Sequence, residues 1–296
     1  MTFKTSSNQE SELFPKKARP IISYTTNISG MMSNTKIVYV CLFLFLIIVL
    51  FKMLGMQIQT NSFSLAEQQI IRVLFIGNSY TYFNDIPWLT QQLAASAKEP
   101  KTLETEMVVI GGATLKSHWK RGEALRLLKA KRWDYVVLQE QSTLPITNPQ
   151  EMYKYATLFD AEIKRVNSQT VFYLTWAKQN KPETQQILTD SYMSIAKELK
   201  AQVAPVGTAW QKIQEANLKL NLYSSDQSHP SPIGSYVAAC VFYTTFYENS
   251  PVGLSRRIYS SNSGSPQESN RIELESLSET DAQMIQQLVE YIVKKI

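Results

Sequence analysis

Cysteine and histidine are scarce in this sequence of 296 residues, which contains two of each. The two cysteines, Cys41 and Cys240, are too few for a disulfide framework and lack the paired spacing of a structural zinc site. The two histidines are His118 and His229, so any proton transfer by an imidazole must use one of them. The sequence therefore predicts neither a metal centre nor a disulfide-stabilised scaffold.

A concentrated run of positive charge is also missing. The formal net charge is +5, but the basic residues are spread along the chain. No basic stripe with interleaved aromatic residues occurs, which argues against a nucleic-acid partner. Hydrophobic residues make up 44% of the sequence, enough for the full core of one domain of ordinary size.

One apolar run stands out in the N-terminal quarter. Residues 1–36 are polar and without periodicity, which predicts a disordered segment. Residues 37–51 form an unbroken apolar run that extends to residue 56 past Lys52, about the length that spans a bilayer. Basic residues precede this run, and none lies between Lys52 and Arg72. The positive-inside rule then predicts a cytoplasmic N-terminus and an extracytoplasmic remainder.

We therefore expect a transmembrane signal-anchor at 37–56 that holds the protein in the lipid bilayer, followed by a polar linker at 57–69. A signal peptide that is cleaved during export is the alternative, particularly if translation starts at Met31 or Met32. No small-x-small cleavage motif follows the run, which favours the uncleaved anchor.

From Ile70 onward, short apolar segments alternate with helical patterns. The expected strands are 71–76, 105–110, 134–139, 170–175 and 202–206. The expected helices are 87–98, 121–131, 150–166, 183–200, 208–218, 233–247 and 279–295. Strands separated by helices indicate crossover connections and a parallel sheet. We expect a flavodoxin-like three-layer α/β/α domain over 70–296 with a five-stranded parallel sheet, and a surface loop at 260–269.

The first of these strands ends in a polar segment, Gly77-Asn78-Ser79. Residues 70–76 are apolar except for Arg72 and read as a strand buried on both faces. Ligands of open α/β sheets bind just beyond the carboxyl ends of such strands. Ser79 lies at that position and is a candidate nucleophile, although a serine there can also simply cap a turn.

Three further segments supply polar groups near predicted strand or helix ends. Glycines 111 and 112 follow the second strand, and residues 139–142 follow the third. Asp226 precedes His229 by three residues, a spacing that lets the carboxylate reach one imidazole nitrogen while the other faces outward. His118 lies among Lys116, Lys120 and Arg121, so we expect it at the surface.

The order and spacing of these segments resemble the SGNH (or GDSL) hydrolases. That family carries Gly-Asp-Ser or Gly-Asn-Ser after the first strand and Asp-x-x-His near the C-terminus. The resemblance covers about residues 70–250. It implies a catalytic triad of Ser79, His229 and Asp226, and oxyanion donors from the backbone amides of Ser79 and Gly112.

One block departs from the family pattern. The asparagine that follows the third strand in the family is absent here, where the sequence is Gln139-Glu140-Gln141-Ser142. Gln141 carries the same amide on a longer side chain and is expected to be the third oxyanion donor, with Gln139 as the alternate. This glutamine-containing block is similar to a bacterial branch of the family.

The resemblance implies a serine ester hydrolase that needs no metal and no organic cofactor. The expected reaction is removal of acetyl groups from carbohydrates outside the cytoplasm. Three aromatic residues are candidates for stacking on the sugar: Tyr80, Tyr82 and Trp176. The alternative is that they are ordinary core or rim aromatics. An O-acyltransferase that uses the same triad remains open. A non-catalytic binding module on the same fold is a further alternative, which the intact triad disfavours.

Overall fold

The computed structural model describes residues 39, 42–47, 69–97, 99, 101–216, 219–261 and 271–296. The segment 1–36 and all of the linker except Gln69 lie outside the described residues. Of the segment 37–56, Tyr39 and residues 42–47 are described, and they are helical. None of the helices in the described ranges is both long enough and apolar enough to cross a membrane.

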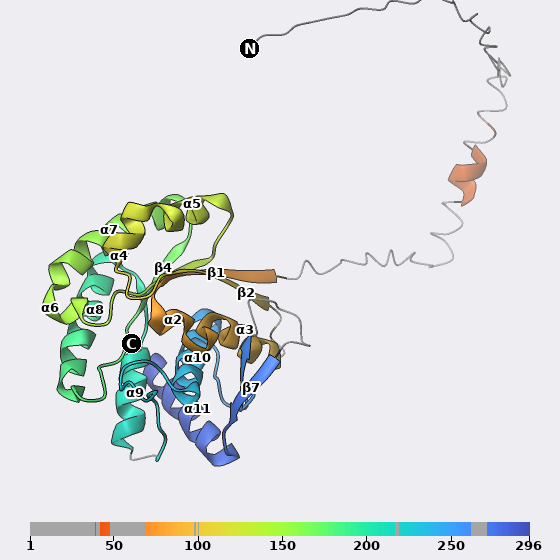
Figure 1. Cartoon of the computed structure of the whole chain (residues 1–296). Helices are drawn as coiled ribbons and strands as arrows, with labels where there is room; N and C mark the ends of the chain where they lie inside the picture. Colours follow the sequence, from red (N-terminus) through yellow and green to blue (C-terminus); the bar gives the residue numbers. More distant parts are fainter. Residues whose placement is uncertain are drawn as a thin grey trace, which may run out of the picture. The chain divides into compact units, whose positions relative to one another are not determined.

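From Gln69 onward, the chain forms a five-stranded parallel sheet with the strand order β2-β1-β3-β4-β5 (Figure 1). The strands are β1 (Gln69–Gly77), β2 (Lys101–Val109), β3 (Tyr135–Leu138), β4 (Gln169–Tyr173) and β5 (Gln202–Ala204). This order is that of a flavodoxin-like sheet. The predicted five-stranded parallel sheet and its flanking helices are therefore confirmed.

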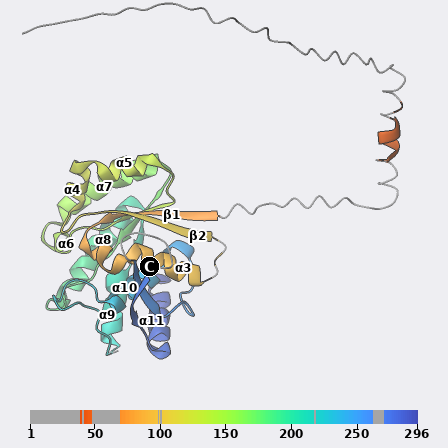
Figure 2. The same ribbon diagram turned by 45° about the vertical axis from the view of Figure 1, so that its right-hand side comes forward.

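Helices cover both faces of the sheet (Figure 2). One face packs its buried side chains against α3 (Ile86–Ser96), α9 (Val206–Glu215), α10 (Pro232–Tyr247) and α11 (Glu279–Val293). The other face packs against α4 (Leu115–Arg121), α5 (Glu123–Ala130), α7 (Pro149–Arg165) and α8 (Gln185–Leu199). The side chains of β1 alternate between these two cores, because Val73 and Phe75 join the first and Leu74 and Ile76 the second.

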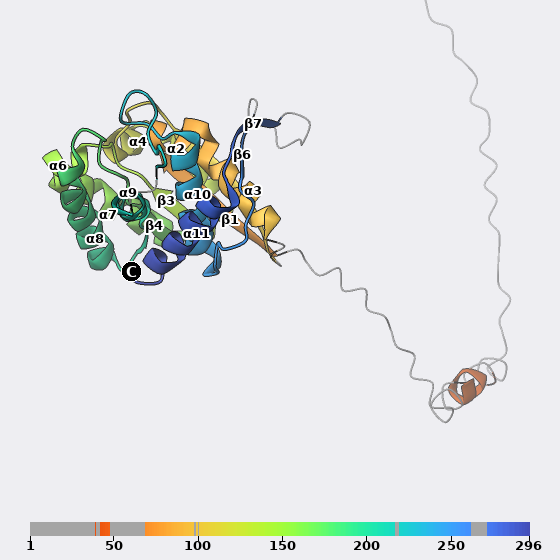
Figure 3. The same ribbon diagram turned by 90° about the horizontal axis from the view of Figure 1, so that it is seen from below.

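Two local expectations are corrected by the structure. The helix expected at 121–131 corresponds to α5, whereas α4, which ends at Arg121, was not expected; Gly122 between the two helices has a φ of 74°. Of the loop expected at 260–269, the first two residues belong to β6 (Arg257–Ser261), which pairs with β7 (Arg271–Ser276) in an antiparallel hairpin, and residues 262–269 lie outside the described residues. Figure 3 shows this hairpin beside α3, on the α10 side of the sheet.

Candidate active site

The nucleophile segment begins where β1 leaves the core. Gly77 has no room for a side chain, because an added Cβ would lie 2.5 Å from Gln139 Oε1 and from Thr81 Oγ1. Asn78 then caps the short helix α2 (Ser79–Tyr82), since its side-chain oxygen accepts the Tyr80 amide at 3.1 Å. Ser79 is thus the first helical residue after a buried strand, and its side chain is half-buried.

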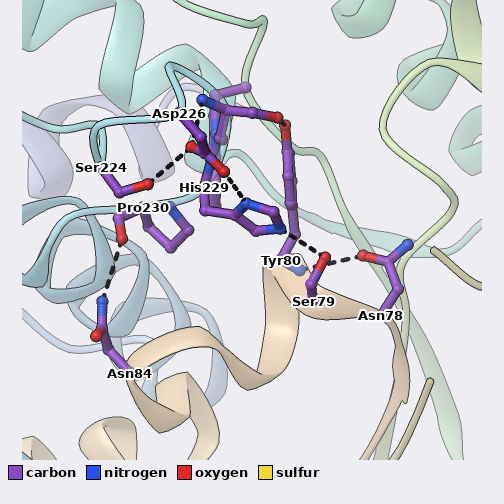
Figure 4. Close-up of polar contacts among 10 residues, drawn as sticks. Asn78, Ser79, Tyr80, Asn84, Ser224, Asp226, His229 and Pro230 are labelled. Atoms are coloured by element: carbon purple, nitrogen blue, oxygen red, sulfur yellow. Dashed lines mark hydrogen bonds and ion pairs between the residues drawn. The ribbon is translucent and has the colours of Figure 1, made fainter. Parts of the chain in front are cut away.

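The structure brings Ser79, His229 and Asp226 together (Figure 4). Ser79 Oγ lies 2.8 Å from His229 Nε2, although the two residues are 150 positions apart in the sequence. His229 Nδ1 contacts Asp226 Oδ2 directly. Because an ionised carboxylate can only accept hydrogen bonds, Nδ1 carries the proton and Nε2 is left to accept from the Ser79 hydroxyl.

The Asp226 carboxylate is kept in its ionised form by its local loop. Burial alone would raise the pKa of Asp226, but hydrogen bonds from His229, Ser224 and the Ser228 amide hold it well below its usual range. One oxygen, Oδ1, accepts from the Ser224 hydroxyl at 2.8 Å and from the amides of Ser228 and His229 at 3.0 and 2.9 Å. The other oxygen is free to orient the imidazole.

The residue before His229 is anchored to an aromatic stack. Ser228 Oγ lies 2.7 Å from Tyr80 Oη, and the Ser228 carbonyl accepts from Trp176 Nε1 at 2.9 Å. The rings of Tyr80 and Trp176 are stacked at 4.7 Å, and Trp176 is stacked on Trp210 at 3.9 Å. The stack therefore positions the His229 loop.

This arrangement corrects the expectation that Tyr80 and Trp176 stack on a sugar. Their exposed fractions are 3% and 1%, so neither ring offers a free face. They are core aromatics, the alternative that the sequence left open. Tyr82 differs, since it is 38% exposed and its hydroxyl lies 3.4 Å from where a Cβ on Gly111 would be.

Two residues that the sequence did not single out also hold the imidazole. The Phe83 ring is stacked on the His229 ring, with 4.2 Å between centroids and 17° between planes. Asn84 Nδ2 donates to the Pro230 carbonyl at 3.2 Å and to Ser235 Oγ at 2.9 Å. Asn84 has a φ of 54° inside the 3-10 turn η1 (Phe83–Asp85), a strained backbone position that often marks a functional site.

The backbone groups expected to bind an oxyanion are free of protein acceptors. Within the ranges that the structure describes, neither the Ser79 amide nor the Gly112 amide hydrogen-bonds to another residue. Gly112 has a φ of 66°, and a Cβ added there would meet nothing within 4 Å. The Gly111–Gly112 turn is therefore open to the surface beside α2.

The two candidate glutamines have different surroundings. Gln139 is fully buried and forms two hydrogen bonds with Asn78. Its Oε1 accepts from the Asn78 amide at 2.8 Å, and its Nε2 donates to Asn78 Oδ1 at 2.9 Å. Gln141 is half-buried, and its Oε1 accepts from the amides of Thr143 and Leu144 at the start of α6 (Leu144–Thr147). Its Nε2 makes a single long contact, 3.4 Å to Ser142 Oγ. Gln141 thus retains a free amide hydrogen, and its role as an oxyanion donor stays a prediction.

His118 lies in the core and not at the surface, so that expectation was wrong. It is 1% exposed, and its Nε2 is 2.8 Å from the Gly77 carbonyl. A carbonyl only accepts, so Nε2 must carry the proton. Burial lowers the pKa of His118, which keeps the ring neutral in this hydrogen bond.

No protein-family model and no curated protein matches the chain. Among solved structures, a protein from Slackia heliotrinireducens described as a candidate SGNH hydrolase is 28% identical with a TM-score of 0.52; the match covers 60% of this chain and 99% of that one. A DUF4886 family protein from Bacteroides uniformis is 17% identical with a TM-score of 0.57, over 76% of this chain and 95% of that one. The second likeness concerns the fold alone. Together with the motif order and the sheet topology, the first confirms that this chain resembles the SGNH hydrolases.

Proposed function

We propose that the protein is a serine ester hydrolase of the SGNH type. The observation that carries the proposal is the 2.8 Å contact between Ser79 Oγ and His229 Nε2, with Asp226 on the opposite ring nitrogen. A serine is a weak nucleophile unless an adjacent base takes its proton, and this geometry supplies that base. The unpaired amides of Ser79 and Gly112 support the proposal, since an ester carbonyl needs donors for its developing negative charge.

The reaction proceeds in two halves. Ser79 Oγ attacks the ester carbonyl carbon while His229 Nε2 takes the hydroxyl proton, and Asp226 stabilises the resulting imidazolium. The carbon–oxygen bond to the alcohol then breaks, and His229 returns the proton to the departing alcohol. Water next attacks the acyl-serine, giving up a proton to His229, and the acid leaves as Ser79 regains its proton.

We further propose an acetylated carbohydrate as the substrate. Tyr82 supports this reading, because it is an exposed aromatic ring close to Gly111, on the same side of α2 as the open glycine turn. Aromatic faces are suited to stacking on sugar rings, and an open turn leaves room for a polymeric alcohol.

Turnover of p-nitrophenyl acetate and p-nitrophenyl octanoate by the full chain tests the proposed reaction. We expect hydrolysis of the acetate by the wild type and none by Ser79→Ala, together with acetate release from an acetylated polysaccharide. Equal turnover of the octanoate would contradict the acetyl preference. Product analysis with added carbohydrate acceptor separates hydrolysis from acyl transfer, because transfer places the acyl group on the acceptor instead of releasing the acid.

We also propose that residues 37–56 anchor the chain in a membrane with the domain outside the cytoplasm. The apolar run and the basic residues before it support this location. The chain should sediment with membranes, and protease added to spheroplasts should digest the domain. Protection of the domain until lysis would overturn the orientation, whereas a mature form that starts after residue 56 would indicate a cleaved signal.

A further inference from the structure

A buried carboxylate lies directly beneath the proposed oxyanion loops. Glu140 follows β3 by two positions and is 1% exposed. Its Oε1 accepts the Gln141 amide at 2.6 Å, and both of its oxygens lie within 3.2–3.3 Å of the Leu115 amide. No Lys, Arg or His in the described part of the chain forms an ion pair with it. Such a group is costly to bury, so its position requires an explanation.

The two amides that Glu140 binds belong to the two loops that flank Ser79. Leu115 begins α4, three residues after Gly112, and Gln141 lies in the loop after β3. The main chain of Glu140 is fixed in turn, because its amide donates to Tyr192 Oη at 3.2 Å and its carbonyl accepts from Gln139 Nε2 at 2.5 Å. One carboxylate thereby joins the Gly112 turn to the end of β3.

We propose that Glu140 is a positioning residue that fixes the Gly112 turn and the Gln141 loop relative to Ser79, so that the oxyanion donors are oriented before substrate binds. This inference rests on the proposed ester hydrolysis. An ionised carboxylate suits the role, because two backbone amides donate to it and charge-assisted hydrogen bonds are stronger than neutral ones. Glutamine cannot replace it fully, since its amide nitrogen would face one of the donors.

Burying Glu140 makes its carboxyl harder to ionise. Burial raises the pKa of Glu140 to about 7, against the two amide hydrogen bonds that lower it. The titratable groups that face it are Tyr192 of α8 and Glu151 of α7, and Glu151 is itself paired with Lys116 of α4. The folded state thus binds a proton at this carboxyl more readily than the unfolded chain does. The ionisation of Glu140 should therefore lower the free energy of unfolding as pH rises from about 4.5 to about 7.

The test compares full-length wild type, Glu140→Gln and the control Glu151→Gln, which removes a neighbouring carboxylate of the Lys116 ion pair. For Glu140→Gln we expect faster amide hydrogen exchange at 110–116 and 139–144, unchanged exchange in β1 and α10, and a kcat about tenfold lower with KM within about twofold. Its thermal midpoint at pH 8 should equal or exceed that of the wild type, a result opposite to the loss expected for a merely structural buried acid. The control should match the wild type in kcat and in exchange.

A second measurement varies pH. In the wild type, the exchange of Leu115 and Gln141, corrected for its intrinsic pH dependence, should be faster at pH 8 than at pH 6, because an opening that hydrates Glu140 is favoured when its carboxyl is ionised. Glu140→Gln should lose this difference. Unchanged exchange in Glu140→Gln, or a kcat within about twofold of the wild type, would overturn the proposal. If the wild type neither hydrolyses esters nor takes a fluorophosphonate probe at Ser79, the proposed function fails. The exchange result then still decides whether Glu140 holds the two loops.

Discussion

The loop that carries His229 and the helix that carries His118 each bring an imidazole to the same end of β1. Both rings place Nε2 2.8 Å from an oxygen, which is Ser79 Oγ for His229 and the Gly77 carbonyl for His118. The serine hydroxyl can give up its proton, whereas the carbonyl can only accept one. Asp226 completes the contrast, because it occupies Nδ1 of His229 and leaves Nε2 as an acceptor. The chemistry of the contacted oxygen, and not its distance, separates the proposed general base, His229, from the structural histidine, His118.

Replacement of the reacting groups gives the largest expected effect. Ser79→Ala and His229→Ala should each lower kcat by about 10⁴-fold or more, and the double variant should be scarcely worse, because the two residues act as one unit. The thermal midpoints should stay within about 3 °C of the wild type, since both side chains reach the surface of the site. A fluorophosphonate probe should label the wild type and not Ser79→Ala. Full activity in His229→Ala would remove the distinction between the two histidines.

The two glutamines extend the comparison to the loop after β3. Gln141→Ala should lower kcat by about 10²-fold, the usual loss for one oxyanion donor. Its thermal midpoint should fall only slightly, because the amides of Thr143 and Leu144 lose their acceptor at the half-buried start of α6. Gln139→Ala should lower the thermal midpoint instead, because it leaves the buried Asn78 amide without its acceptor. Kinetics and thermal unfolding of both variants check this assignment. If Gln141→Ala retains full kcat, its carboxamide serves only to cap α6.

His118→Phe should act on stability more than on chemistry. It leaves the Gly77 carbonyl without the imidazole donor, a loss of about 1–3 kcal/mol for a buried acceptor. We expect a thermal midpoint several degrees lower and a kcat reduced by less than about tenfold, since the donor positions the nucleophile segment only indirectly. A kcat loss as large as that of His229→Ala would show that His118 takes part in the reaction.

The smallest expected effect is a difference in pH dependence. Burial lowers the pKa of His118 from its ordinary value of 6.5, so the unfolded chain binds a proton that the folded state excludes. The stability contributed by neutral His118 is present above pH 6.5 and is lost as pH falls below it. Denaturant unfolding between pH 5 and 7 should show a shallower loss of stability toward acid in His118→Phe. An identical slope would mean that folding leaves the pKa of His118 unshifted.

The triad could be found from sequence because its members lie in short motifs that are unspecific alone but are informative in their order and spacing. Ser79 follows a buried strand, and Asp226 and His229 share one turn. The five-stranded sheet could also be predicted from the sequence, since its strands are short apolar segments separated by helical patterns. The pairing of β6 with β7 could not, because neither strand shows the apolar pattern of the sheet strands.

The supporting residues were harder to predict, because their partners are distant in the sequence. The basic neighbours of His118 suggested exposure, yet one face of α4, made by Leu115 and His118, is buried. Tyr80 and Trp176 are buried through contacts with Trp210 and Ser228, and no local pattern connects these four residues. Gln139 and Gln141 are two residues apart, so strand alternation would place both on one face. Their surroundings differ because the chain has already left β3, which ends at Leu138.

The stacked pair Trp176–Trp210 has an optical consequence. Two indoles 3.9 Å apart and 5° from parallel are close enough for their transitions to couple, and the coupling contributes to the circular dichroism of the folded protein. Since Trp176 Nε1 is bonded to the Ser228 carbonyl, a displacement of the His229 loop would tilt one ring against the other. The chain contains five tryptophans, so Trp210→Phe would isolate the coupled signal by difference. The stacked pair is therefore a spectroscopic reporter of the loop that holds the proposed general base.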